Sequence, residues 1–451
     1  MTDGLQSRSP LRIAVDGYHL GMVKGTGLAS YSLDLTRTLR AMGTEIHPVY
    51  GGRSASSSES PEIAFFDTFR PRPGRRPWIK GIGLARMLAH VAASVVGKAT
   101  HAQCIDRVTA VDIRPLKNLL PEWDAIHFVP WSYQEALRMN RLFGCVYQVA
   151  LRKPVDIFHS TFPVPVTVKG AAAVTTIADL IPFRMPFVTL DHKPVLLRLI
   201  KQAAARSRAI CAISEATRKD VLSFLPIAPE KVFVTYPAVE FPQELLDVPE
   251  GEIARFLKLM YRLDAGRYLL FVSALEPRKN LPRLLDAYLG ADVNIPLVVV
   301  GKEQWRDEGL KRVEAIFAES GQAGAGQSII RIPYTPRSHL VHLYRGARAL
   351  VFPSLAEGFG LPPVEAMALG CPTVVSRIPC LEEVCGDAAD YFDPYDVRSI
   401  REAITAVVHD DGRAEELREK GRKNAARFTH QKSGEQLAAA YRFALRPDSQ
   451  Q

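Results

Sequence analysis

The chain has 451 residues, 47% of them hydrophobic, so it is too long for a single core and suits two soluble globular domains. Lysine and arginine outnumber aspartate and glutamate by 57 to 48, and this excess favours an anionic partner such as a nucleotide, a diphosphate lipid or a membrane surface. No run approaches the roughly 18 to 20 apolar residues of a membrane span, and the start of the chain is polar, so we expect neither a transmembrane helix nor a secretory signal. The six cysteines are scattered without zinc-type spacing, which indicates reduced thiols in a cytoplasmic protein.

The first element is a predicted strand at residues 11–16, followed by a glycine loop and a helix from about residue 28 to residue 42. Gly25 and Gly27 stand directly before that helix, where backbone amides can approach a phosphate. The pattern suits an ordinary strand-to-helix turn equally well. We therefore treat Gly25 and Gly27 as candidates for a phosphate-facing loop.

A basic segment follows the polar, serine-rich residues 51–62. Between Arg70 and Thr100 the sequence holds seven lysines and arginines and no aspartate or glutamate, and apolar residues recur at helical spacing over residues 79–96. A basic amphipathic helix on an anionic membrane surface and a core helix with a solvated basic face both fit this pattern. The absence of acidic residues favours the membrane.

Two later strands of the first half end in loops where an acceptor could sit. The strand that begins at Val155 runs through His159 into a proline-rich loop, and the next covers about residues 173–182. A lone histidine at a strand end is more often a satisfied structural group than a catalytic one, so His159 is a candidate only. Further on, Ser214 is placed to cap a helix that runs from Glu215.

The second half opens after a predicted linker at residues 238–252. A buried strand at residues 268–272 leads to Arg278 and Lys279, and in a loop two adjacent cations can converge on one diphosphate. The other interpretation is a solvated pair that caps a helix. We expect Lys279 to be an exposed loop cation that contributes little to stability.

The most informative stretch lies between two predicted strands, residues 349–353 and 372–376, with a helix between them. In a parallel sheet, ligands bind where the strands end, so the loop that begins at Glu357 lies where a ligand is held. Glu365 follows eight positions later on the helix, and two such carboxylates can meet different hydroxyls of one extended ligand. Otherwise Glu357 is a solvated loop residue and Glu365 stabilises the helix dipole.

The stretch from Ser354 to Ser376 resembles the Glu, seven residues, Glu signature of retaining glycosyltransferases of family four, and its flanks agree as well as the pair. The resemblance implies an α/β protein with the GT-B fold, in which two Rossmann-like doubly wound domains face a cleft. Residues 1–240, with a basic insertion at about 51–140, form the acceptor-side domain, which a helix crossing back at about 430–451 completes. Residues 241–430 form the nucleotide-sugar domain.

The same resemblance assigns roles to residues. Glu357 orients sugar hydroxyls, Glu365 holds the ribose, and His159 lies near the transferred sugar. The donor diphosphate is met by cations and loop residues, namely Arg278, Lys279, Gly25, Gly27, Gly358, Phe359, Gly360 and Leu361. The chain departs from the family at Thr161, where some members have a second histidine, and at Ser273-Ala274, where members with Gly-Arg carry another arginine.

The chemistry that follows is a metal-independent transfer without a cofactor, because no Asp-x-Asp occurs to hold a divalent ion. Arg278 and Lys279 would neutralise the leaving diphosphate, with Lys279 counted as catalytic, and a donor phosphate oxygen would take the acceptor proton. The sequence is similar to bacterial mannosyltransferases of surface polysaccharide assembly, which implies GDP-mannose as donor, a glycan or lipid-linked acceptor at the inner face of the plasma membrane, and no nucleic-acid partner. A UDP-sugar transferase, a GT-B epimerase and an inactive nucleotide-sugar-binding protein remain alternatives.

Overall fold

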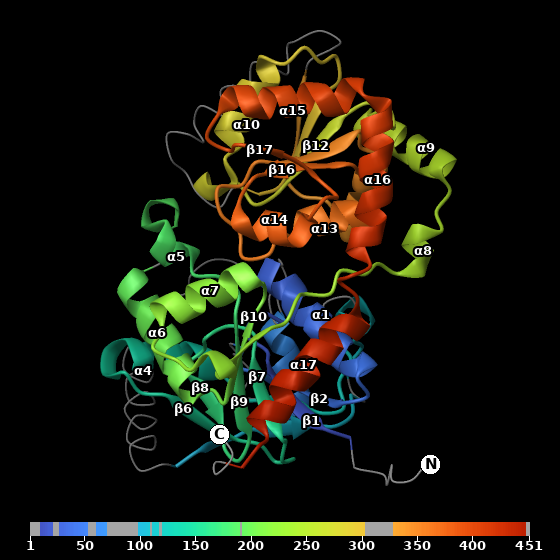
Figure 1. Cartoon of the computed structure of the whole chain (residues 1–451). Helices are drawn as coiled ribbons and strands as arrows, with labels where there is room; N and C mark the ends of the chain where they lie inside the picture. The colour runs from blue at the N-terminus through green and yellow to red at the C-terminus, as the bar shows by residue number, and fades with distance from the viewer. Residues whose placement is uncertain are drawn as a thin grey trace, which may run out of the picture.

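The computed structural model describes residues 10–20, 27–52, 60–69, 98–108, 111–116, 120–189, 192–302 and 328–447. Figure 1 shows two α/β units stacked one above the other, with the chain passing between them twice. The amino-terminal part of the chain builds the lower unit and the carboxy-terminal part builds the upper one, except that the last helix returns to the lower unit.

The lower unit contains an eight-stranded sheet in the order β11-β10-β9-β7-β1-β2-β5-β4, in which only β4 runs antiparallel to its neighbour. A small sheet, β3-β6-β8, packs beside it. The strands of the lower unit are β1 (Arg12–Asp16), β2 (Glu45–Tyr50), β3 (Thr100–His101), β4 (Gln103–Ile105), β5 (Ile126–Phe128), β6 (Tyr147–Ala150), β7 (Ile157–Ser160), β8 (Val166–Val168), β9 (Ala172–Ile177), β10 (Ala209–Ala212) and β11 (Val232–Val234). Its helices are α1 (Gly27–Ala41), α2 (Pro61–Phe66), α4 (Ser132–Phe143), α5 (Ile181–Arg184), α6 (Lys193–Arg206) and α7 (Glu215–Phe224).

The upper unit contains a six-stranded, fully parallel sheet in the order β14-β13-β12-β15-β16-β17. Its strands are β12 (Leu269–Val272), β13 (Leu297–Val300), β14 (Ile329–Ile332), β15 (Ala349–Phe352), β16 (Thr373–Ser376) and β17 (Asp390–Phe392). The helices of this part are α8 (Gln243–Leu246), α9 (Glu250–Tyr261), α10 (Leu281–Leu289), α12 (Arg337–Gly346), α13 (Leu361–Ala368), α14 (Pro379–Cys385), α15 (Val397–His409) and α16 (Asp411–Ala425).

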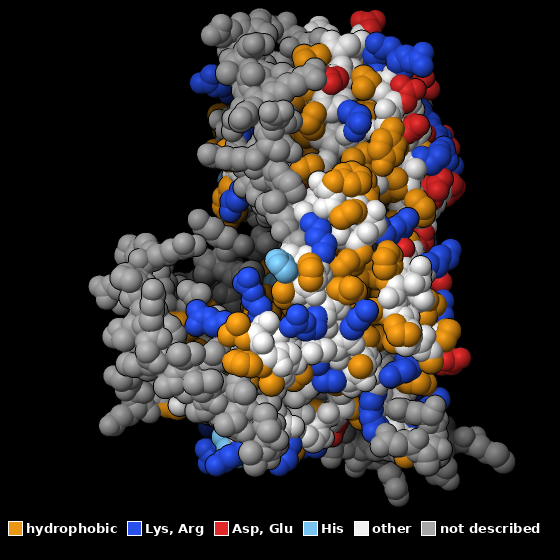
Figure 2. Space-filling model, turned by 90° about the vertical axis from the view of Figure 1, so that its left-hand side faces the viewer, with side chains coloured by type: hydrophobic (Ala, Val, Ile, Leu, Met, Phe, Trp, Pro, Cys, Tyr) orange, Lys and Arg blue, Asp and Glu red, His pale blue; other side chains and the backbone are white. Residues whose placement is uncertain are grey.

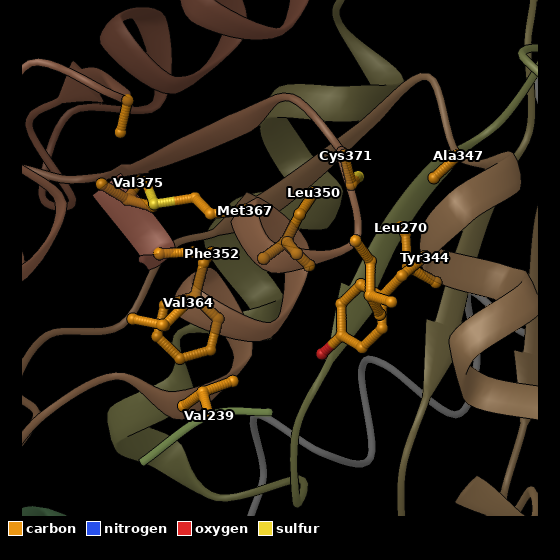
Figure 3. Packing of buried hydrophobic residues seen from close by; sticks show 14 of the residues in the cluster. Val239, Leu270, Tyr344, Ala347, Leu350, Phe352, Val364, Met367, Cys371 and Val375 are labelled. Atoms are coloured by element: carbon orange, nitrogen blue, oxygen red, sulfur yellow. The ribbon is translucent and has the colours of Figure 1, made fainter. Parts of the chain in front are cut away.

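Both faces of the upper sheet are buried, which explains why its strands are almost continuously apolar. Successive side chains of a strand point to opposite faces, so Leu270 packs with helices α9, α12 and α13, whereas Leu269 packs with α10 and α15. Figure 3 shows the first of these layers, where Leu350 and Phe352 of β15 lie against Val364 of α13. Helices on both faces of a parallel sheet make it doubly wound, as predicted.

The last helix, α17 (His430–Ala444), crosses back onto the lower unit, where it packs against α1 (Figure 1). Tyr441 and Leu437 join the core formed by β1 and α1, and Thr38 Oγ1 lies 2.9 Å from Nδ1 of His430. The predicted fold class, including this returning helix, is confirmed. The predicted linker is more ordered than expected, because residues 238–252 include α8 and the start of α9.

The predicted basic membrane helix, residues 79–96, lies outside the described residues, as does most of the segment from Arg70 to Thr100. Within the part of the chain that the structure does describe, no helix combines the length and the apolar character that crossing a bilayer requires.

Candidate active site

The two cations predicted at the end of β12 meet the carboxylate predicted after β15. β12 and β15 are neighbours in a parallel sheet, so their carboxyl ends bring the two following loops together. Arg278 Nη1 lies 3.0 Å from one carboxylate oxygen of Glu357, and Lys279 Nζ lies 2.5 Å from the other. Glu357 therefore bridges the two cations across loops that are separated by almost eighty residues in the chain.

Lys279 is buried, which corrects the expectation of an exposed loop cation. Its side chain and that of Glu357 are each only 8% exposed. The loop is held against the sheet by Asn280, which adopts a left-handed conformation and donates to the carbonyl oxygens of Pro353 and Pro394. This turn places the Lys279 ammonium 5.1 Å from the centre of the Phe352 ring.

The charges of this cluster stabilise one another. Burial raises the pKa of Glu357, but the nearby charges of Lys279 and Arg278 outweigh it and hold that pKa at about 2. For Lys279, burial lowers the pKa below its ordinary value and the Glu357 charge offsets only part of the effect. For Arg278, burial also lowers the pKa, but the negative charges of Glu357 and Glu276 raise it by more than burial lowers it. The pKa of Arg278 is therefore above its ordinary value and the side chain stays charged. Glu357 is thus ionised throughout the physiological range.

The glycine loop that follows Glu357 is shaped for close approach. Gly360 adopts φ +96°, which favours glycine, and is the N-cap residue of helix α13. A side chain on Gly358 would collide with the carbonyl of Ala178, which belongs to the loop after β9 of the lower unit. Both proline residues of the first turn of α13 lack an N–H group, so anion binding at this helix start rests on the amides of residues 358–361.

Phe359 does not present its ring to a ligand. The side chain is buried and packs against Phe428 and Tyr236, with ring centres 5.2 and 6.1 Å away. Only its backbone is available for the donor contact that the sequence predicts. Leu361 is half-buried at the first position of α13.

Glu365 lies on α13, half-buried, in surroundings different from those of Glu357. Tyr344 donates its hydroxyl to Glu365 Oε2 at 3.1 Å. Burial raises the pKa of Glu365, the positive charge of Arg337 lowers it, and the negative charge of Asp34 on α1 raises it further. The second signature carboxylate thus lies where charges of the two units meet.

His159 is not brought together with Glu357. It lies within β7, fully buried, with Nδ1 2.6 Å from the Tyr441 hydroxyl and Nε2 2.8 Å from Thr176 Oγ1. Burial lowers its pKa to about 3, so it stays neutral. Both ring nitrogens contact protein groups, so His159 links β7 to α17. Its expected place near the transferred sugar stays a prediction.

Of the two glycines predicted to face the phosphate, Gly27 is the first residue of α1 and Gly25 lies outside the described residues. At the start of the same loop, Asp16 ends β1 fully buried and accepts hydrogen bonds from the backbone and hydroxyl of Thr161. Burial raises the pKa of Asp16 to about 6, and those hydrogen bonds offset part of the rise. Asp16 is not among the site residues predicted above, although its position at the end of the first strand is a signal that could have indicated it.

Ser214 caps α7 as predicted, accepting from Thr217 N at 2.9 Å, and has a second contact that the sequence could not reveal. Its hydroxyl donates to the carbonyl of Gly358 at 2.6 Å. Glu383 of α14 accepts from the amides of Glu215 and Ala216 at 2.6 and 2.8 Å. The Ser214 bond ties the start of α7 to the loop that carries Glu357, and the Glu383 bonds tie it to α14.

No group of three or more histidine, cysteine, aspartate or glutamate side chains is arranged to hold a metal ion within the described ranges. The described site offers the partly buried Arg278, the buried Lys279, a carboxylate between them and the amides of a glycine loop. Such a set can bind a diphosphate and the hydroxyls of a sugar.

Two family models match the chain. The model described as Glycosyl transferases group 1 matches residues 262–426, and the model described as Glycosyltransferase Family 4 matches residues 107–241. O-antigen chain mannosyltransferase B of Escherichia coli is 29% identical over 277 residues, which cover 60% of this chain and 70% of that protein. O-antigen chain mannosyltransferase RfbU of Salmonella typhimurium is 26% identical over 344 residues, covering 73% of this chain and 85% of that protein.

The fold is shared with solved structures. Anabaena Alr3699/HepE in complex with UDP and glucose superposes with a TM-score of 0.62 at 13% identity, covering 95% of this chain and 98% of that one. Together with the two sheets, the returning helix and the matched family models, this likeness establishes the GT-B architecture. The chain belongs to glycosyltransferase family 4 and is a retaining glycosyltransferase.

Proposed function

We propose that the protein transfers mannose from GDP-mannose to a glycan or lipid-linked glycan acceptor in the assembly of a surface polysaccharide. The observation that carries the proposal is the cluster of Arg278, Lys279 and Glu357, which places one partly buried and one buried cation beside a carboxylate. Mannose is supported by the names of the O-antigen chain mannosyltransferases that the chain resembles. Residues 241–430 would bind the donor and residues 1–240 the acceptor.

The cluster suggests how the donor is held. A diphosphate is a stronger partner for two cations than one carboxylate, because it offers more negative charge and more acceptor oxygens. When the diphosphate engages Arg278 and Lys279, Glu357 is released from part of its ion pairing and can accept hydroxyls of the sugar. The cations then neutralise the charge that develops on the leaving group without a metal ion.

The other groups would complete the donor site. The amides of Gly358 to Leu361 lie at a helix start, where they can meet phosphate oxygens. Glu365, on the next turn of that helix, would accept ribose hydroxyls. The acceptor proton would pass to an oxygen of the departing diphosphate on the same face of the sugar, so that the configuration is retained. Gly25 and Gly27 would approach the diphosphate from the lower unit.

A screen of nucleotide sugars by thermal shift tests the donor. A ligand that binds only the folded state raises the melting temperature according to its affinity, so GDP-mannose should give the largest shift of the panel. A UDP-sugar is the second candidate, because the structural neighbour from Anabaena was solved with UDP and glucose. A shift with a UDP-sugar and none with GDP-mannose would reject mannose transfer from GDP-mannose and favour that candidate.

Product analysis separates transfer from the other activities. With acceptor present, NMR of the product should show the anomeric configuration of the donor. Incubation with the nucleotide sugar alone should leave it unchanged. An isomerised nucleotide sugar would instead identify an epimerase, and binding without turnover on any acceptor would identify a nucleotide-sugar-binding protein.

A further inference from the structure

We propose that helices α4 and α6 present a docking surface for an anionic lipid bilayer. This α4–α6 surface consists of Arg138, Arg141, Leu142, Phe143, Arg198 and Lys201, all exposed. It is separate from the basic segment between Arg70 and Thr100. The inference rests on the proposed function in one respect: a lipid-linked acceptor requires the enzyme to work at a membrane.

The two helices form one continuous surface because polar contacts lock them together. Arg198 Nη1 donates to the backbone carbonyls of Asn140 and Arg141 at the end of α4, at 3.0 and 3.3 Å. Gln202 Nε2 donates to the Gly144 carbonyl at 2.9 Å, directly after α4. The cations of α6 and the last turn of α4 are therefore held side by side.

Large apolar side chains lie exposed within this surface. Leu142 and Phe143 are 62% and 50% exposed at the carboxyl end of α4. Two adjacent exposed apolar side chains have no packing function within the described fold, and apolar side chains surrounded by cations are the composition that inserts at the boundary of a bilayer.

The charge of the surface has one sign. Helix α6 contains no aspartate or glutamate, and the only acidic residue of α4, Glu135, is buried. Figure 2 views the side of the molecule that carries α4 to α6 in Figure 1. On its lower half, the described lysine and arginine side chains lie among hydrophobic ones, whereas acidic side chains gather in the upper half and at the edges.

This charge selects the occupant. A second copy of the chain would bring the same cations against this surface and be repelled, whereas anionic lipid headgroups attract each of them. Exposed Leu142 and Phe143 can also enter the acyl boundary, which a hydrated acidic protein surface does not offer. An anionic bilayer therefore satisfies both components of the surface.

The α4–α6 surface belongs to the same unit as the loop that approaches the candidate active site. That loop contains Ala178, whose carbonyl lies close to Gly358, and the chain continues from it through the exposed ring of Phe187 towards α6.

Co-sedimentation with vesicles tests the surface. The full chain is mixed at low salt with vesicles of phosphatidylcholine containing one quarter phosphatidylglycerol, and with vesicles of phosphatidylcholine alone. Wild-type protein should sediment with the first and not with the second, and 0.5 M NaCl should release it. The variant Arg141→Ser/Lys201→Ser should lower the partition coefficient roughly tenfold or more, because each basic residue near an anionic surface adds to binding.

Matched controls come from the upper unit. Leu142→Ser/Phe143→Ser should also reduce sedimentation, whereas Leu259→Ser/Met260→Ser should not, although Leu259 and Met260 on α9 are even more exposed, at 76% and 57%. Arg398→Ser/Lys423→Ser removes two exposed cations from α15 and α16 and should sediment like the wild type. Circular dichroism confirms that each variant is folded.

The outcomes separate this inference from the proposed function. Transfer to a short soluble acceptor should be unchanged in the surface variants, so loss of sedimentation with retained transfer supports the surface. If the wild type does not sediment with anionic vesicles, or if both surface variants sediment with them to the same extent as the wild type, the α4–α6 surface does not bind membranes. This conclusion holds whichever nucleotide sugar is the donor. A concentration-dependent dimer that Leu142→Ser/Phe143→Ser dissociates would assign the surface to self-association and overturn the inference.

Discussion

The hydroxyl of Ser214 donates a hydrogen bond to the carbonyl of Gly358 at 2.6 Å, and so connects a helix cap of the lower unit to the residue next to Glu357. The same oxygen of Ser214 accepts from Thr217 N and caps α7. Thr217 Oγ1 also donates to the Gly358 carbonyl, at 3.1 Å. The position of the Glu357 loop therefore depends on α7, although the loop belongs to the upper unit and α7 to the lower one.

Thr217→Val tests this dependence, because it removes a hydroxyl from the Gly358 carbonyl and leaves the cap of α7 intact. We expect kcat to fall roughly threefold to tenfold, the equivalent of one hydrogen bond, with little change in the KM for the donor. Ser214→Asp should behave similarly, since a carboxylate still caps the helix but cannot donate. Ser214→Thr keeps both functions and should retain activity. If kcat of all three variants equals that of the wild type, α7 does not position the loop.

Lys279→Met should abolish most of the transfer and also destabilise the protein, in contrast to an exposed cation. Removing one partner of a buried pair leaves Glu357 with Arg278 alone, and we expect a loss of about 1–3 kcal/mol in the free energy of unfolding. Urea denaturation measures the loss. Lys279→Met/Glu357→Gln removes both charges and should recover part of the stability but none of the activity. An unchanged midpoint in Lys279→Met would contradict the burial of this pair.

The pH dependence of stability should carry a contribution from Asp16. Its pKa is raised to about 6 in the folded protein, above the usual value near 4, so the folded state holds the proton more tightly than the unfolded state does. The stabilisation is therefore present below about pH 4 and is lost as the pH rises through about 6. Asp16→Asn should flatten the unfolding free energy between pH 4 and 7 relative to the wild type. If the unfolding free energies of the wild type and Asp16→Asn change in parallel between pH 4 and 7, Asp16 does not titrate in that range.

His159→Phe distinguishes a structural from a catalytic histidine. The substitution leaves the hydroxyls of Tyr441 and Thr176 without this partner in the core, so we expect destabilisation by about 1–3 kcal/mol. Below the new melting temperature, kcat and KM should stay within a few-fold of the wild-type values. A loss of activity by several orders of magnitude in a folded variant would show that His159 is catalytic.

Transfer should survive an excess of EDTA, because we propose that Arg278 and Lys279 neutralise the leaving diphosphate in place of a divalent ion. The assay compares initial rates before and after dialysis against chelator, with added magnesium or manganese as the control. A steep loss that either ion restores would show that a metal ion takes part in the reaction.

Much of the donor site could be predicted from the sequence alone, because its signals are local. Arg278 and Lys279 directly follow an apolar strand, and Glu357 with its glycines lies between a strand and a helix. A strand followed by a glycine turn and a helix predicts its own geometry, and parallel strands bring such loops to one edge. The fold class and the position of these loops at one edge of the sheet follow from these local patterns, whereas the ion pairs of Arg278 and Lys279 with Glu357 do not.

Only the tertiary structure decided which of these residues are buried and what they contact. Lys279 is buried because Asn280 bonds to carbonyls that lie far along the chain, at Pro353 and Pro394. His159 forms a hydrogen bond with Tyr441, on a helix that returns from the other end of the sequence. Ser214 of the lower unit donates a hydrogen bond to Gly358 of the upper unit. Such contacts join residues more than seventy positions apart, and local periodicity carries no information about them, because they form only when packing brings the separate elements together.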